Sequence, residues 1–131
     1  MKTNELMLSD WVFAYGHPRQ VEIIYGERIQ ADCIELSEGE FEPIPLTPEI
    51  LEKNGFKIYE QDFTSNIVYE FGSLDYMEFE EFHKYFDIGS KITYEHFGRE
   101  ITYIHPLMRI YFVHELQHAL RLCEINKEII L

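Results

Sequence analysis

The sequence is poor in cysteine and in basic residues, and it contains no long apolar run. No apolar stretch approaches the roughly 20 residues that a transmembrane helix needs, so we expect no membrane span. The first ten residues carry acids where a secretory signal has a basic segment and an apolar one, which predicts a cytoplasmic protein. Eleven Lys and Arg against 24 Asp and Glu give a formal net charge of −13. Direct nucleic-acid binding is therefore not expected.

The two cysteines, Cys33 and Cys123, lie far apart in the sequence and form no Cys-x-x-Cys pair. This spacing gives no cysteine-based metal site. We expect both residues to be buried free thiols in a reducing compartment, with a long-range disulfide as the alternative.

Apolar and aromatic residues are plentiful. Apolar side chains make up 46% of the chain and aromatic ones 15%, which excludes an intrinsically disordered protein. A chain of 131 residues with this composition can bury a core of its own, so we predict a single domain over residues 1–131.

The pattern of apolar residues, turns and caps predicts an α+β fold. The N-terminal third alternates short β-type runs with Gly-containing turns, which is typical of a meander that curls into a small barrel. Within it, residues 8–12 resemble the first strand of SH3-like barrels. Thr47 as N-cap, Pro48 at the first helical position and Gly55 after the end predict a helix over residues 48–54.

The other elements follow from local patterns. We expect residues 73–87 to form either a helix or a strand, because their aromatic residues fit both. The remaining predictions are strands at 11–15, 20–25, 28–34, 56–60 and 66–71, a hairpin with arms 91–95 and 100–104, and a C-terminal helix over 107–125 packed on the sheet.

The negative charge is concentrated in the first two thirds of the chain. Residues 29–52 and 58–83 each contain seven acids and no Lys or Arg. Such a surface can serve solubility alone, or it can attract a basic partner. On the second interpretation, the candidate partner-binding residues are Glu35, Glu38, Glu40, Glu42, Glu78, Glu80 and Glu81.

One motif in the predicted C-terminal helix could carry chemistry. His114, Glu115 and His118 match the H-E-x-x-H pattern, in which two imidazoles one turn apart bind zinc and the Glu activates a water. A third ligand is needed. Glu124 is one candidate, and His96 and His105 are the others. On an unbroken helix, however, Glu124 would lie about 120° away from His118 at about 100° per residue.

The helical wheel gives a second argument against a zinc site. It divides the C-terminal helix into an apolar face and a polar arc formed by His114, Gln117, His118 and Arg121. We expect that arc to be partly exposed to solvent, with no apolar pocket around the histidines. We therefore favour no catalytic residue, no metal and no cofactor, and we keep zinc as the alternative.

Three segments of the chain carry a resemblance to a known family. They are N-E-L-x-L-x-D-W-V at residues 4–12, P-L-T-P-E-I-L-E-K-N-G-F at 45–56 and Y-x-V-H-E-L-Q-H-A-L-R-L at 111–122. Together they resemble a family of short bacterial proteins encoded in prophages, phages and conjugative elements of gut anaerobes. That family has no assigned activity, so the resemblance implies a genetic context. Many relatives have H-x-L-Q-N at the motif, which implies that Glu115 and His118 are replaceable.

These observations favour a non-enzymatic, acidic interaction protein of mobile-element origin. The expected partner is a host or phage protein with a basic surface, and the sequence leaves the oligomeric state open. Two alternatives remain. One is a zinc-dependent hydrolase that uses the H-E-L-Q-H motif, and the other is a small-ligand-binding protein that acts in counter-defence.

Overall fold

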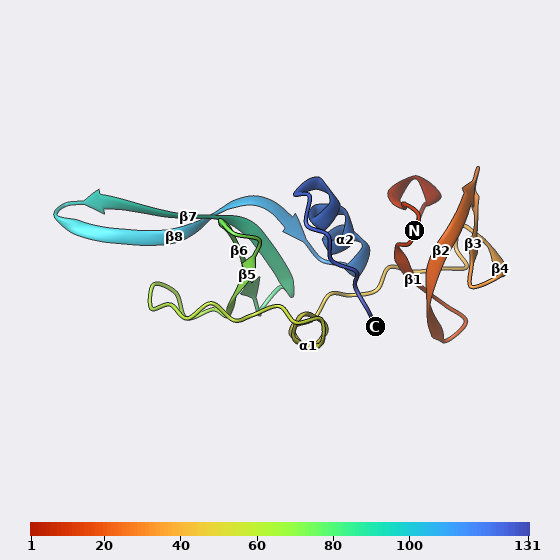
Figure 1. Ribbon diagram of the computed structural model, residues 1–131, viewed down its shortest axis with the longest axis horizontal. Coiled ribbons are helices and arrows are strands. Elements are labelled where there is room, and N and C mark those ends of the chain that lie inside the picture. Colours follow the sequence, from red (N-terminus) through yellow and green to blue (C-terminus); the bar gives the residue numbers. More distant parts are fainter. The chain divides into compact units, whose positions relative to one another are not determined.

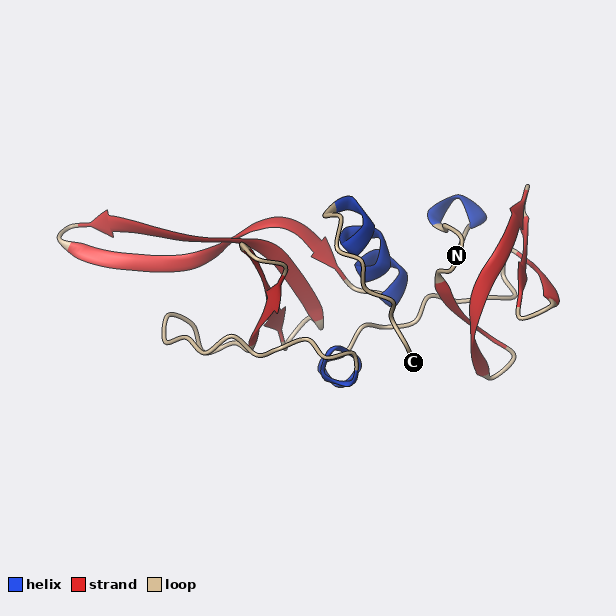
Figure 2. Cartoon of the chain, viewed as in Figure 1, coloured by secondary structure: helices blue, strands red, loops and turns tan.

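The computed structural model describes all residues from 1 to 131 and confirms the α+β class. It contains two antiparallel four-stranded sheets and two α-helices (Figure 1 and Figure 2). The chain forms two compact units. Unit 1 comprises Met1–Pro45, Phe112–Ile129 and Leu131, and unit 2 comprises Leu46–Tyr111 and Ile130. The single domain expected from the chain length stays a prediction.

The sheet of unit 1 is an antiparallel meander with strand order β1-β2-β3-β4. Its strands are β1 (Trp11–Ala14), β2 (His17–Tyr25), β3 (Arg28–Ala31) and β4 (Ile34–Ser37). Two of its two-residue turns, Tyr15-Gly16 and Asp32-Cys33, have positive φ at both positions, which suits the twist of hairpins. The meander prediction is confirmed, but the sheet does not close into a barrel, because four short strands are too few to enclose a core.

Alternating residues of this sheet form the core of unit 1. The short 3₁₀ helix η1 (Thr3–Glu5) precedes β1 and leads into Leu6, which is buried among the strand residues. The core cluster consists of Leu6, Val12, Ala14, Val21, Ile29, Ala31, Leu36 and Phe41. Burial of every second residue gives each strand one inward face.

Unit 2 begins with the helix that the sequence predicts most clearly. Helix α1 spans Pro48–Lys53, and the Thr47 hydroxyl accepts the backbone N–H of Ile50 at 3.3 Å. Gly55 adopts φ +78°, and Phe56 N–H donates to the Leu51 carbonyl at 3.1 Å. This bond belongs to a Schellman motif, which satisfies carbonyls of the last turn. The predicted helix and its caps are confirmed.

The sheet of unit 2 has strand order β5-β6-β7-β8. Its strands are β5 (Val68–Phe71), β6 (Asp75–Glu80), β7 (Tyr85–His96) and β8 (Arg99–Ile110). The ambiguous region 73–87 is therefore strand, turn and strand. The hairpin predicted around residues 91–104 is confirmed and is longer than expected. The predicted strand 56–60 is reduced to an isolated bridge between Ile58 and Tyr69.

The C-terminal helix starts later than predicted and ends earlier. Helix α2 spans Val113–Leu122, because residues 107–110 continue β8 and pair with β7. Pro106 is tolerated because β8 is an edge strand and the register shifts beside Gly89. A Cβ at Gly89 would lie 1.8 Å from the His105 carbonyl oxygen, so only glycine fits there. No helix is long and apolar enough to cross a membrane.

Candidate functional site

Half of the polar arc of α2 is buried, whereas the side chains of His118 and Arg121 are 26% and 35% exposed, as the expectation of a partly exposed arc requires. His114 and Gln117 are each 7% exposed. Gln117 accepts the Trp11 backbone N–H through Oε1 and donates to the Ser9 carbonyl through Nε2, both at 2.9 Å. Its side-chain amide thus joins α2 to the chain on either side of Asp10. A polar side chain such as that of Gln117 can be buried at little cost when its groups find partners.

Asp10 is the centre of this contact, and its carboxylate is completely buried. His118 Nε2 lies 2.6 Å from Oδ2, and Arg121 donates to Oδ1 from 2.9 Å. The Met7 backbone N–H donates to Oδ2 at 2.8 Å, and Arg121 also donates to the Leu8 carbonyl at 2.9 Å. His118 and Arg121 therefore hold the start of β1 on helix α2.

Asp10 was not among the candidate residues predicted from the sequence. The available signal was its position in an otherwise largely apolar stretch, because a charged residue there is buried only when it is paired. The hydrogen bonds of Asp10 and Gln117 also link residues 4–12 to residues 111–122.

The Glu of the H-E-L-Q-H motif has a local structural role. Glu115 Oε1 accepts the Phe112 backbone N–H at 3.0 Å, and Phe112 is the N-cap residue of α2. Glu124 lies beyond the end of α2 with φ +56°, and Ile125 N–H donates to the Leu120 carbonyl at 2.8 Å. The chain therefore leaves the helix before Glu124, whereas the sequence predicted an unbroken helix there. No three His, Cys, Asp or Glu side chains are grouped so that they could hold a metal ion.

His114 borders a pocket of about 440 Å³. Its ring stacks on Phe112 with centroids 5.9 Å apart, and its Nδ1 is buried without a hydrogen-bond partner. Burial lowers the pKa of His114, although nearby acids, chiefly Glu115, act in the opposite direction. The neutral imidazole is the form that suits this environment. The pocket is lined by Met1, Glu5, Pro43, Phe112, His114, Glu115 and His118.

The lowered pKa of His114 predicts a loss of stability in acid. The unfolded chain binds the proton near the usual value of 6.5, whereas the folded chain binds it only at lower pH. The free energy of unfolding should therefore fall as the pH decreases through this value. The wild type should therefore be less stable at about pH 5 than at about pH 7.5. We expect this difference in the free energy of unfolding, measured with urea, to be smaller in His114→Phe.

The control for this measurement is His17→Phe, since His17 is exposed in the same unit. It should retain the pH dependence of the wild type. An identical pH dependence in His114→Phe and in the wild type would show that His114 does not contribute.

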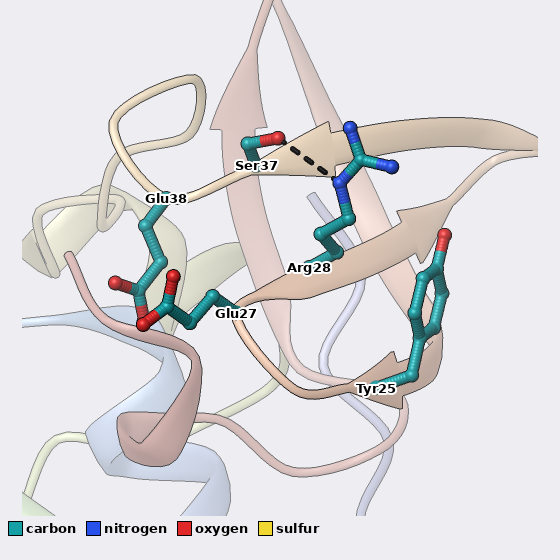
Figure 3. Close-up of a pocket in the computed structure, with 5 residues that line it drawn as sticks. All are labelled: Tyr25, Glu27, Arg28, Ser37 and Glu38. Atoms are coloured by element: carbon teal, nitrogen blue, oxygen red, sulfur yellow. Dashed lines mark hydrogen bonds between the residues drawn. The ribbon is translucent and has the colours of Figure 1, made fainter.

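A second pocket, of about 360 Å³, lies among the acids of unit 1. Figure 3 shows Glu27 and Glu38 side by side on one side of it, with Tyr25 and Arg28 on the other. Arg28 donates to the Ser37 hydroxyl at 3.3 Å and also pairs with Glu35 on β4. Glu27 was not among the residues that we selected from the sequence.

Two of the acids predicted to bind a partner are held in place by the fold. Glu38 accepts the Thr3 backbone N–H at 2.8 Å, and this bond keeps the pKa of Glu38 below its usual value. Glu40 accepts hydrogen bonds from the Tyr15 hydroxyl and from Ser37 N–H, and the Tyr15 bond is the main cause of its lowered pKa. Both side chains are therefore fixed and negatively charged at neutral pH.

The remaining acids of the predicted set fall into both units. In unit 1, Glu42 is exposed, and its backbone pairs with Phe13 of β1. In unit 2, Glu78 and Glu80 lie on β6, and Glu81 lies in the turn that follows. A single acidic surface formed by all seven residues stays a prediction.

The cysteines differ from expectation in their burial. Cys33 and Cys123 are both free, as predicted, but both are exposed. Cys33 occupies a turn position with φ +63°, and Cys123 is the residue at the C-terminal cap of α2. Turn and cap positions lie at the protein surface, which overrides the usual preference of cysteine for the interior.

We compared the chain with protein families, curated proteins and solved structures. No protein-family model matches the chain, and neither a curated protein nor a solved structure is significantly similar to it.

Proposed function

We propose that this chain is a non-enzymatic, acidic interaction protein of mobile-element origin that binds a host or phage protein with a basic surface. The observation that supports this most directly is the fixed, charged state of Glu40 and of Glu38, which lines a pocket together with Glu27. Carboxylates that are already ordered lose little conformational entropy on binding, so they favour recognition of Lys and Arg. The pocket between Glu27 and Tyr25 is the proposed position for one basic side chain.

The proposed location is the cytoplasm. Two exposed free thiols are compatible with a reducing compartment, where cysteines persist without forming disulfides. The proposed mobile-element origin rests on the resemblance of three segments to a family of short proteins encoded in prophages, phages and conjugative elements.

The zinc-dependent hydrolase stays an alternative hypothesis. Its candidate base, Glu115, is engaged at the helix N-terminus, and one nitrogen of His118 is engaged by Asp10. Metal analysis of the purified, untagged protein and of His118→Ala distinguishes this alternative, because a hydrolase requires stoichiometric metal that the variant loses.

The proposed partner should be captured from a host lysate in a salt-dependent manner. Screening shortens the range of charge interactions from about 10 Å at 0.1 M salt to about 3 Å at 1 M. We expect a basic protein to bind the immobilised chain at low salt and to be released at high salt. Glu27→Lys combined with Glu42→Lys should abolish capture, whereas reversal of Glu38 or Glu40 would also break hydrogen bonds of the fold.

The matched control is Glu124→Lys combined with Glu128→Lys, which changes the net charge equally at the C-terminal end of unit 1. This control should retain the captured protein. If capture did not depend on the salt concentration, or if both double variants lost it equally, a partner site that includes Glu27 and Glu42 would be contradicted.

A further inference from the structure

The outer part of the β7–β8 hairpin is a two-stranded ribbon without a neighbouring strand on either side. Strand β6 pairs with β7 only as far as Ser90, opposite Asp75. From residue 91 to residue 104 the two strands pair with each other alone, and Figure 1 shows this ribbon reaching beyond β5 and β6. Its turn, Phe97-Gly98, has positive φ at both residues. The edge of β7 over residues 91–96 therefore has unpaired backbone groups, which can accept another strand.

The ribbon has two different faces. On one face Ile92 lies opposite Tyr103, and Tyr94 lies opposite Ile101. Tyr94 is 46% exposed and Tyr103 is 38% exposed, so this aromatic face is open to solvent. A two-stranded ribbon is marginally stable by itself, and additional strands that share its apolar face stabilise it.

The opposite face contains a charge conflict. Glu95 lies directly opposite Glu100, and neither carboxylate takes part in an ion pair of this chain. Like charges at opposed positions destabilise a strand pair. The other charged residue on this face is Lys91, whose Nζ lies 3.4 Å from the Tyr59 hydroxyl.

We infer that the β7 edge pairs antiparallel with the same edge of a second copy of this chain, with the two-fold axis at Thr93. In this register Lys91 lies opposite the partner's Glu95, and Ile92 lies opposite the partner's Tyr94. The sequence Lys-Ile-Thr-Tyr-Glu is thus complementary to itself in charge and in apolar character. Each Glu95 gains a Lys neighbour, and the aromatic faces of both ribbons become continuous. A two-fold interface of this kind is closed, so it produces a dimer.

The charge of the ribbon argues for a second copy as the occupant. Residues 91–104 contain two bases and two acids, so the ribbon is formally neutral in a chain of net charge −13. Two copies can meet here without the repulsion that opposes contact between acidic surfaces. A basic partner would find no Asp or Glu on the aromatic face, which contains Arg99 and the histidines His96 and His105.

The oligomeric state of the full chain tests this inference. Sedimentation velocity over a range of concentrations should show a dimer that dissociates on dilution, since the interface is small. Lys91→Glu and Glu95→Lys, each made alone, place like charges opposite each other twice per dimer. Each should raise the dissociation constant at least tenfold. The double variant Lys91→Glu with Glu95→Lys restores opposite charges and should restore the dimer.

The control is Glu100→Lys, which changes the charge of the same face on β8 and leaves the β7 edge intact. It should retain the dimer. A wild-type chain that is monomeric at all concentrations would overturn the inference. The inference would also be overturned if neither single reversal changed the dissociation constant. The same holds if the double variant did not restore the dimer that the single reversals weaken. None of these measurements depends on the proposed basic partner, so the two proposals fail independently.

Discussion

Replacing Asp10 by alanine should lower the free energy of unfolding by about 3–5 kcal/mol, the usual cost of removing one partner from a buried charge network. The variant leaves His118 and Arg121 without their shared acceptor, and it leaves the Met7 backbone N–H unsatisfied. Denaturant unfolding at neutral pH, followed by circular dichroism, measures the loss. We expect this to be one of the two largest effects of a single substitution in the chain.

Two further variants define the origin of that loss. Asp10→Asn keeps the shape of the side chain but places its amide NH₂ group toward another hydrogen-bond donor. Its free energy of unfolding should therefore lie between those of the wild type and Asp10→Ala. Asp62→Ala removes an exposed acid and should stay within about 0.5 kcal/mol of the wild type. Equal losses in Asp10→Ala and Asp62→Ala would refute the buried network.

The second large effect concerns the apolar face of α2. Leu116 is 0% exposed, so Leu116→Ala should cost about 2–5 kcal/mol through lost burial and the cavity left behind. The same denaturant experiment measures it. The helical wheel predicted an apolar face for this helix, and Leu116 belongs to that face and is buried.

Leu122→Ala is the matched control for Leu116→Ala. Leu122 belongs to the same helix and is 76% exposed, so its substitution should change stability by no more than about 0.5 kcal/mol. If the two leucine variants lost the same stability, the assignment of the buried face of α2 would be wrong.

The residues of the H-E-L-Q-H segment have structural roles in this fold. Leu116 contributes to the buried apolar face, Gln117 holds the backbone around Asp10, and His118 contacts its carboxylate. Each residue therefore has contacts that stabilise the fold, independently of any catalysis. The functional surfaces that we propose lie elsewhere, at Glu27 and its neighbours in unit 1 and at the β7 edge in unit 2.

Elements that depend on local signals could be predicted from the sequence. Thr47, Pro48 and Gly55 define both ends of α1 through contacts within a few residues, and the structure reproduces them. The hairpin around Phe97-Gly98 was equally predictable, because its turn residues and its alternating arms lie next to each other in the chain. Local signals of this kind need no knowledge of distant segments.

The start of α2 and the contacts of its polar arc depend on distant parts of the chain. Residues 107–110 fit a helix or a strand equally well over so short a length, and pairing with β7 selects the strand. The burial of Gln117 within the polar arc could not be predicted, because its partners at Ser9 and Trp11 lie more than a hundred residues away in the sequence. A helical wheel records which residues share a face, but burial depends on hydrogen-bond partners that only the folded chain brings together.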